Sequence, residues 1–394
     1  MPFSQSESLN SIYLDNAATT RVDSDAAKLA YDMMCSFYAN PSSAHAFGFE
    51  AEKRLRTARE QVLAALGFSH TDGSLIFTSG GTEADNLALR GCVHALARRG
   101  KHIVTTDSEH PAVENTVREL EKEGFTATRL STKGGKLDFD QARAALTPDT
   151  VLVSCMAANN ETGAVYDIAA LSKLVKALCP HAVFHTDAVQ GFTKINSTAF
   201  RAADLVSVSA HKIHAPKGAG ALFVRKGVRL VPLVAGGGQE GNIRSGTEAM
   251  PALCAFGLAA EKAMRDFSAR TRHIASLNAY LREKLAFLPE VTVNSGTDGF
   301  LPHILSIAIP GIRSEILLRF LGERGISVSA GSACSAKHAD NRVLAAFGLE
   351  DRIADSTLRI SFSHDNTTDE LDAFVKNLNE GIHSLTPIKP ARHN

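Results

Sequence analysis

The sequence places a lysine directly after a short apolar run, in the stretch Val206-Ser-Val-Ser-Ala-His-Lys-Ile213. Such a run is typical of a strand in a buried sheet, and lysine is almost never fully buried unless it is paired or chemically used. A desolvated amine loses its proton more easily and can then form a Schiff base as a nucleophile. The alternative is that Lys212 lies at a strand end with its ammonium in water, and this stretch alone does not separate the two.

Other polar and titratable residues also follow apolar runs directly. Ligands bind at the carboxyl ends of the strands in sheets of parallel strands, so these residues are expected to meet at one site. They are Glu109, His110, Asn159, Asn160, Glu161, Asp187, Gln190, His211 and Lys212.

Alternation of strand-like and helical segments predicts the elements that position this site. The expected strands are 101–106, 127–130, 151–156, 182–186, 205–208 and 221–224. Their rhythm indicates an α/β fold with a mainly parallel central sheet. A long helix over about 259–288 leads to an α+β pattern, with strands at 303–309 and 358–362 around a helix at 314–321. We therefore expect a large domain at 15–258 and a small domain formed by 1–14 and 259–394.

A strand, a glycine pair and a helix start follow one another at 75–86, which is the arrangement of an anion site. Thr82 could also serve only as the N-cap of that helix, and the two roles are compatible. A GxGxxG match at 236–241 precedes no clean helix, so it is weak evidence for a dinucleotide site. An extended loop that reaches a neighbouring site is the better interpretation there, and no zinc-type spacing occurs in the sequence.

Bulk properties restrict the function. Lys+Arg and Asp+Glu are balanced at 42 each among 394 residues, which gives no net field for nucleic acid or an anionic membrane. The N-terminus has no signal-peptide pattern, and no apolar run reaches the ~20 residues that span a bilayer. The six cysteines are scattered, which indicates a reducing setting, and we expect a cytoplasmic protein.

Cys334 differs from the other cysteines because it lies among Gly, Ser and Ala at 326–337. Small residues bury a thiol poorly, so we expect a mobile loop that carries this one. An unreactive surface thiol is the plainer alternative. The other five cysteines lie in apolar or helical runs and are interpreted as small core residues.

Nine motifs in order carry a family likeness: YLDNAATT, NPSSAHAFG, FTSGGTEADN, EH, NNETG, HTDAVQ, SAHK, RSGT and GSAC. Together they resemble the pyridoxal-phosphate (PLP) dependent cysteine desulfurases of the class V aminotransferase superfamily, over nearly the whole chain. The resemblance implies PLP fold type I and makes Lys212 the Schiff-base lysine. It also implies that Asp187 pairs with the pyridine nitrogen, that Gln190 bonds the phenolic oxygen, and that His110 stacks on the ring.

The same resemblance implies the remaining contacts. Gly81, Thr82, Ser209 and His211 would hold the cofactor phosphate, together with Thr247 from the partner subunit of a homodimer. Asn160 and Arg359 would hold the substrate, the arginine through its bidentate contact with a carboxylate. Asn160 would also contact the cofactor, and His110 would assist proton transfer as a catalytic residue. Where the family commonly has a basic residue after GGGQE, this chain has Gly241.

The implied reaction is removal of sulfur from L-cysteine, which gives L-alanine and a persulfide on Cys334. The persulfide would then pass to an acceptor protein, either an iron–sulfur scaffold or a tRNA-modifying enzyme. Alternatives are a selenocysteine lyase or another PLP-dependent aminotransferase or lyase, although a plain aminotransferase needs no thiol. A protein of another class, a non-catalytic sulfur-carrier scaffold, would not need Lys212, Asp187, His110 and Cys334 together.

Overall fold

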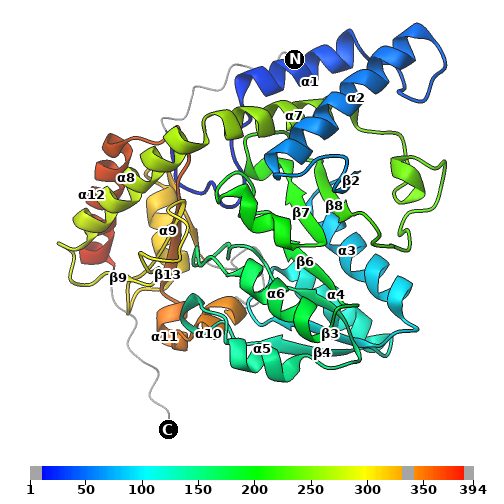
Figure 1. The fold of residues 1–394 in the computed structure, drawn as a ribbon. Helices are drawn as coiled ribbons and strands as arrows, with labels where there is room; N and C mark the ends of the chain where they lie inside the picture. The colour runs from blue at the N-terminus through cyan, green and yellow to red at the C-terminus, as the bar shows by residue number, and fades with distance from the viewer. Residues whose placement is uncertain (1–10, 331–340, 386–394) are drawn as a thin grey trace.

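A seven-stranded sheet forms the centre of the larger part of the molecule in the computed structural model, which describes residues 11–330 and 341–385 (Figure 1). The strand order is β2-β8-β7-β6-β5-β3-β4, and only β8 runs antiparallel to its neighbours. The predicted mainly parallel α/β sheet is therefore confirmed. Its strands are β2 (Gly73–Thr78), β3 (His102–Thr106), β4 (Thr126–Leu130), β5 (Thr150–Ser154), β6 (Val183–Asp187), β7 (Leu205–Ser209) and β8 (Gly220–Arg225).

Helices cover both faces of this sheet (Figure 1). On one face, α1 (Ser24–Cys35), α2 (Ala46–Ala65), α6 (Ile168–Leu178) and α7 (Met250–Arg265) share a hydrophobic core with the strands. On the other face, α3 (Gly81–Leu96) and α4 (Pro111–Lys122) build a second core. Because both faces are covered, β3, β5, β6 and β7 are buried at every position, including their Thr, Ser, His and Asp residues. The short helix α5 (Phe139–Ala145) lies before β5.

The smaller part has its own core, around an antiparallel sheet of order β12-β13-β10-β9. Strand β1 pairs in parallel with β11, so the start of the chain joins this part. Leu14 packs in the core of the smaller part, whereas Ala259 and Ala260 pack with α1 and α2 in the core of the larger part. The predicted domain division remains a prediction. The elements are β1 (Ile12–Tyr13), α8 (Phe267–Leu285), β9 (Thr292–Val293), β10 (Ile304–Ala308), α9 (Ser314–Gly322), β11 (Ile326–Ser327), β12 (Ser329–Ala330), α10 (Arg342–Phe347), α11 (Asp351–Ala354), β13 (Thr357–Ser361) and α12 (Thr368–Ser384).

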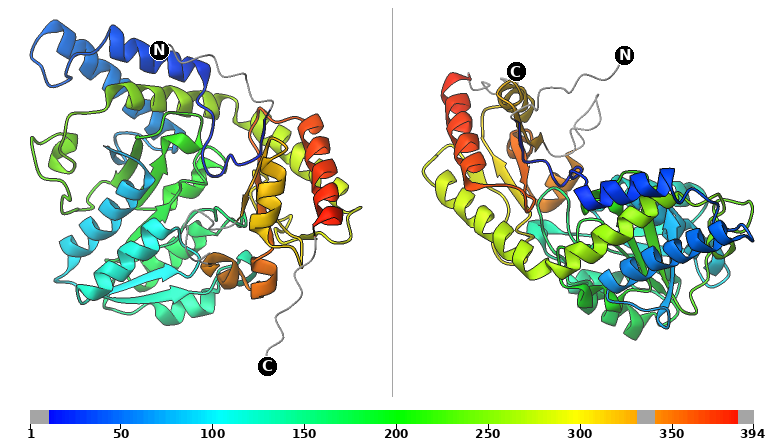
Figure 2. Two further views of the ribbon diagram at one scale, coloured as in Figure 1. Left: turned by 180° about the vertical axis from the view of Figure 1, so that it is seen from behind. Right: turned by 90° about the horizontal axis from the view of Figure 1, so that it is seen from above.

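The connection between the two parts differs from the single helix predicted over 259–288. Two helices, α7 and α8, meet at Asp266, which is not helical (φ −98°, ψ 8°). Figure 2 shows the two helices running from the large sheet to the smaller part. The carboxylate of Asp266 accepts hydrogen bonds from Arg265 and Arg270 at the break. The spacing of apolar residues carries no information about these polar contacts, so it did not predict the break.

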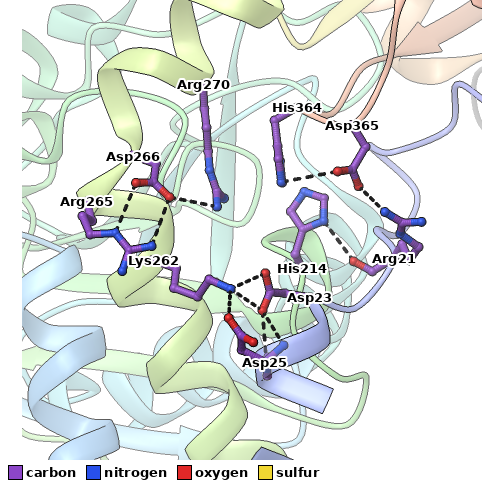
Figure 3. A network of polar contacts seen from close by, with 11 residues as sticks. Arg21, Asp23, Asp25, His214, Lys262, Arg265, Asp266, Arg270, His364 and Asp365 are labelled. Atoms are coloured by element: carbon purple, nitrogen blue, oxygen red, sulfur yellow. Dashed lines mark hydrogen bonds and ion pairs between the residues drawn. The ribbon is translucent and has the colours of Figure 1, made fainter. Parts of the chain in front are cut away.

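Ion pairs at this junction join α7, just before the helix break, to the start of α1 (Figure 3). Lys262 donates to the carboxylates of Asp23 and Asp25 at 2.7 and 2.6 Å. The imidazoles of His214 and His364, one from each part, lie edge to face with centroids 4.6 Å apart. The junction therefore contains both acidic and basic side chains. Across residues 11–330 and 341–385, every helix is too short or too polar to cross a membrane.

Candidate functional site

A cavity of about 640 Å³ opens where the carboxyl ends of β5, β6 and β7 and the start of α3 face the smaller part. Ten of the predicted site residues line it, as expected for polar groups at the ends of parallel strands. They are Gly81, Thr82, His110, Asn160, Asp187, Gln190, Ser209, His211, Lys212 and Arg359. Their placement together is an observation, whereas their individual roles remain predictions.

Lys212 lies in a 3₁₀ turn, Ala210–Lys212, directly after β7. Its Nζ donates to the carbonyl oxygens of Ala17 and Ala18, both at 2.7 Å. These carbonyls follow β1 in the YLDNAATT motif, and small side chains allow this backbone to approach the lysine closely. The amine is therefore held in the cavity by neutral acceptors.

Asp187 and His110 form the polar floor beside Lys212. Burial raises the pKa of Asp187, and the neighbouring His110 and Lys212 oppose that rise. Asp187 Oδ1 accepts from the backbone N–H of Val189 at 2.9 Å. His110 caps α4 through Nδ1, which accepts from Ala112 N at 3.1 Å, and burial lowers its pKa. A neutral imidazole with an acceptor at Nδ1 carries its proton on Nε2.

The start of α3 forms a cradle of backbone groups. Gly80 is the N-cap and no side chain caps the helix, so the interpretation of Thr82 as N-cap is wrong. A Cβ at Gly81 would lie 2.7 Å from Val189 Cγ2, so only glycine fits that close approach. Ser209 Oγ is buried and finds no hydrogen-bond partner among the described residues. Unpaired N–H groups and an unsatisfied hydroxyl fit a phosphate.

Arg359, on β13, reaches the cavity from the smaller part and is 6% exposed. Its guanidinium donates to Asp15 Oδ1 and to the backbone oxygen of Asn160, both at 2.9 Å. The guanidinium thus forms an ion pair with a carboxylate of the chain itself. Asn160 Oδ1 is buried without a partner among the described residues and is available to a bound molecule.

Three further residues at the site, Arg342, Asp85 and Lys194, were not among the predicted ones. Arg342 lines the cavity and donates to the backbone oxygens of Asp107 and Glu109. Asp85, on the first turns of α3, also lines it, and burial together with Asp187 raises its pKa well above the ordinary range. Lys194 donates through its Nζ to Gln190 Oε1, and Gln190 lines the cavity. The predicted Glu109 does not line the cavity, but its Oε1 accepts from the N–H of Met156, which does. Within the described residues no cluster of His, Cys, Asp and Glu has a geometry suited to a metal ion.

Two predicted residues are not in the cavity as described. Thr247 lines a separate pocket with Tyr38 and Met250, so its role in a partner's site remains a prediction. Cys334 lies outside the described residues. Of the remaining cysteines four are buried, but Cys35 at the end of α1 is exposed, so its interpretation as a core residue is wrong.

Glu109 makes the stability of the protein depend on pH. Burial raises its pKa to about 8, above the 4.5 expected in the unfolded chain. The stability it contributes is therefore complete below pH 4.5 and is lost as the pH rises toward 8. We expect the apoprotein of Glu109→Gln to lose less free energy of unfolding than wild type between about pH 5.5 and 8, by as much as about 3 kcal/mol.

Urea unfolding at the two pH values measures this difference. The control is Glu119→Gln, because Glu119 is exposed on the neighbouring helix α4. If Glu109→Gln and wild type lost stability equally, Glu109 would already be ionised in the folded protein.

Comparison with known proteins agrees with this geometry. The family described as aminotransferase class-V matches residues 12–374. A cysteine desulfurase of Trichormus azollae is 40% identical over 387 residues, 97% of this chain and 96% of that protein. The cysteine desulfurase IscS of Vibrio vulnificus (strain CMCP6) is 38% identical over 96% of this chain and 94% of that protein.

Solved structures give the same result. A NifS-like protein superposes with a TM-score of 0.90 at 36% identity, covering 95% of this chain and 100% of that one. A structure of SspA in complex with cysteine has a TM-score of 0.77 at 32% identity, covering 90% and 99%. The chain belongs to the class-V aminotransferase family. Within that family it is a full-length relative of the cysteine desulfurases, and it is a PLP-dependent enzyme of fold type I.

Proposed function

We propose that this protein is an L-cysteine desulfurase that forms L-alanine and leaves the sulfur as a persulfide on Cys334. One observation carries most of the proposal. Lys212, Asp187 and His110 lie around a cavity that also presents a phosphate-type cradle and Arg359. When bound, PLP supplies an electron sink for negative charge at the substrate Cα.

The residues that line the cavity then have the following proposed roles. Arg359 binds the substrate carboxylate, and Asn160 orients it. Lys212 would hold PLP and move the proton at Cα, because its Nζ lies in the cavity, where it donates to the neutral carbonyl oxygens of Ala17 and Ala18. Asp187 would hold a proton at the ring nitrogen of PLP, and His110 would contact the ring, with its Nε2–H available for proton transfer.

Cys334 accepts the sulfur as a thiolate. The substrate's Cβ–S bond breaks and an S–S bond forms, so the sulfur is oxidised while Cβ is reduced to the methyl group of alanine. No further oxidant or reductant is needed. Four other thiols, among them Cys92 and Cys254, are buried. Burial raises the pKa of Cys92 to about 12 and that of Cys254 to about 11, which disfavours their thiolates.

Incubation with L-cysteine tests the proposal by quantifying alanine and protein-bound sulfane sulfur. We expect wild type to form both in equal amounts, and Cys334→Ser to bind PLP normally but lose the protein-bound sulfur. Cys35→Ser, which changes the exposed cysteine of α1, is the matched control and should equal wild type. Unchanged persulfide in Cys334→Ser would assign the sulfur to another cysteine. Parallel reactions with selenocysteine measure the preference between the two substrates.

The proposal includes a homodimer, a sulfur-acceptor protein and a cytoplasmic, reducing location. Exposed apolar side chains near the pocket of Thr247 support the homodimer, because large exposed apolar groups on neighbouring elements commonly mark an interface. They are Tyr31, Met34, Tyr38, Phe47 and Phe49, which are 57–74% exposed. The acceptor is an iron–sulfur scaffold or a tRNA-modifying enzyme, as proposed from the resemblance.

A further inference from the structure

Lys194 lies four residues beyond Gln190, in the turn that follows β6. It lines a second, smaller cavity of about 40 Å³, and Lys212 lines both cavities. The preceding residue, Thr193, has a φ of 59°, which β-branched residues rarely adopt. Such a backbone persists where surrounding contacts enforce it, and it often occurs at functional sites.

The amine of Lys194 contacts the side chain of Gln190. Its Nζ donates to Gln190 Oε1 at 2.9 Å, and Gln190 Nε2 donates to the carbonyl oxygen of Ala17 at 2.9 Å. An ammonium has only donors, so the carboxamide must turn its oxygen toward Lys194. The amide nitrogen then faces Ala17 and the main cavity, with a second N–H to offer. Ala17 O also accepts from Lys212 Nζ, so one carbonyl joins both side chains.

Lys194 also brings positive charge to the site. No carboxylate of the described residues lies within ion-pair distance of its Nζ, and burial lowers its pKa to about 7, with Lys212 and Arg359 adding to the effect. Anionic groups bound in the cavity oppose this lowering, so cofactor and substrate favour the ammonium.

We propose that Lys194 is a positioning residue that orients the Gln190 carboxamide, so that its N–H groups face the phenolic oxygen of PLP. The proposal rests on the proposed cofactor-binding role of Gln190. Without the ammonium, the carboxamide can rotate and present its oxygen to an oxygen of the cofactor, which is repulsive. Lys194 therefore acts on cofactor binding through Gln190 and does not touch the reacting atoms.

The groups that face Lys194 come from several elements, and all of them except the Gln190 carboxamide are bases. None of the described residues that line the small cavity is a carboxylic acid. His214, Arg270 and His364, three of these bases, are visible at the domain junction in Figure 3. The facing groups are Gln190, His211, Lys212, His214, Arg270, His303, Arg359 and His364.

Two measurements test the proposal. The dissociation constant of PLP is measured at neutral pH, and the midpoint of its visible absorbance is measured across a pH series. We expect Lys194→Met to bind PLP about 10-fold more weakly, since a buried hydrogen bond to a charged group is lost. Removal of a positive charge beside Lys212 should also raise the absorbance midpoint. Lys194→Arg keeps donors and charge and should restore both values. Lys226→Met, an exposed lysine after β8, is the matched control.

A double-mutant cycle identifies Gln190 as the intermediary. In a Gln190→Ala background, Lys194→Met should cause no further loss of PLP affinity. A full additional loss there, or wild-type affinity in Lys194→Met, would overturn the proposal. If Lys194→Met does not fold, Lys194→Gln replaces it, because glutamine keeps a hydrogen-bond donor without the charge. This variant should raise the pH midpoint of the visible absorbance and lose less PLP affinity than Lys194→Met would. An unchanged pH midpoint in Lys194→Gln would count against the proposal. PLP affinity and the absorbance midpoint are measured without sulfur release. A protein that binds PLP but releases no sulfur would therefore contradict the proposed function and leave the proposal for Lys194 intact.

Discussion

Lys212→Ala is expected to lose desulfurase activity by at least about 10³-fold, because it removes both the covalent anchor of the cofactor and the base at Cα. The visible absorbance of the bound cofactor should disappear as well. The ammonium donates to Ala17 O and Ala18 O at 2.7 Å, and truncation leaves both carbonyls without this donor. A partial loss of stability should accompany the loss of activity, and thermal unfolding of the apoprotein measures it.

The control for this variant is Lys226→Ala, which removes an exposed lysine at the end of β8. It should retain the absorbance and the activity of wild type. If Lys212→Ala kept the visible band, another lysine would carry the cofactor. Lys194 would then be the next lysine to replace by mutation, because it lines the smaller cavity together with Lys212.

Asp187→Asn is expected to lower kcat by about 10³-fold or more, since a neutral amide no longer keeps the ring nitrogen protonated. The fold should persist, because an asparagine oxygen can still accept from Val189 N, as Asp187 Oδ1 does at 2.9 Å. Activity at saturating L-cysteine and the absorbance spectrum of the bound cofactor measure the effect. Asp187→Asn should still bind PLP, but the visible absorbance band of the bound cofactor should shift.

A second buried aspartate provides the matched control. Asp204 precedes β7 at the opposite end of the sheet, where it accepts from Phe184 N at 2.8 Å and pairs with Lys176. Asp204→Asn should lower stability but keep the activity of each folded molecule. Equal loss of kcat in both variants would mean that Asp187 acts only through the fold.

Strand ends were predictable because polar residues stop a buried strand abruptly. Apolar runs predicted the positions of β5, β6 and β7 to within one or two residues. Asp187 is the last residue of β6, and Lys212 lies just after β7. Lys194 was not predictable in this way. It follows an irregular turn at Thr193, and its contact with Gln190 depends on a backbone conformation that β-branched residues rarely adopt.

Contacts between distant segments were the other feature that the sequence did not reveal. Asp15 and Arg359 are far apart along the chain, and their ion pair exists because β1 joins the smaller part beside β13. The N-cap of α3 shifted from Thr82 to Gly80 because the glycine pair, and not the hydroxyl, forms the turn. Local propensity does not distinguish these possibilities, since tertiary contacts decide between them.

The most direct measurement is the mass of the peptide that carries Cys334 after one turnover with L-cysteine. The proposed function predicts one added sulfur atom on Cys334 in wild type, with one equivalent of alanine, and neither product in Lys212→Ala. Alanine without added sulfur on Cys334, or sulfur found on Cys35 instead, would contradict it.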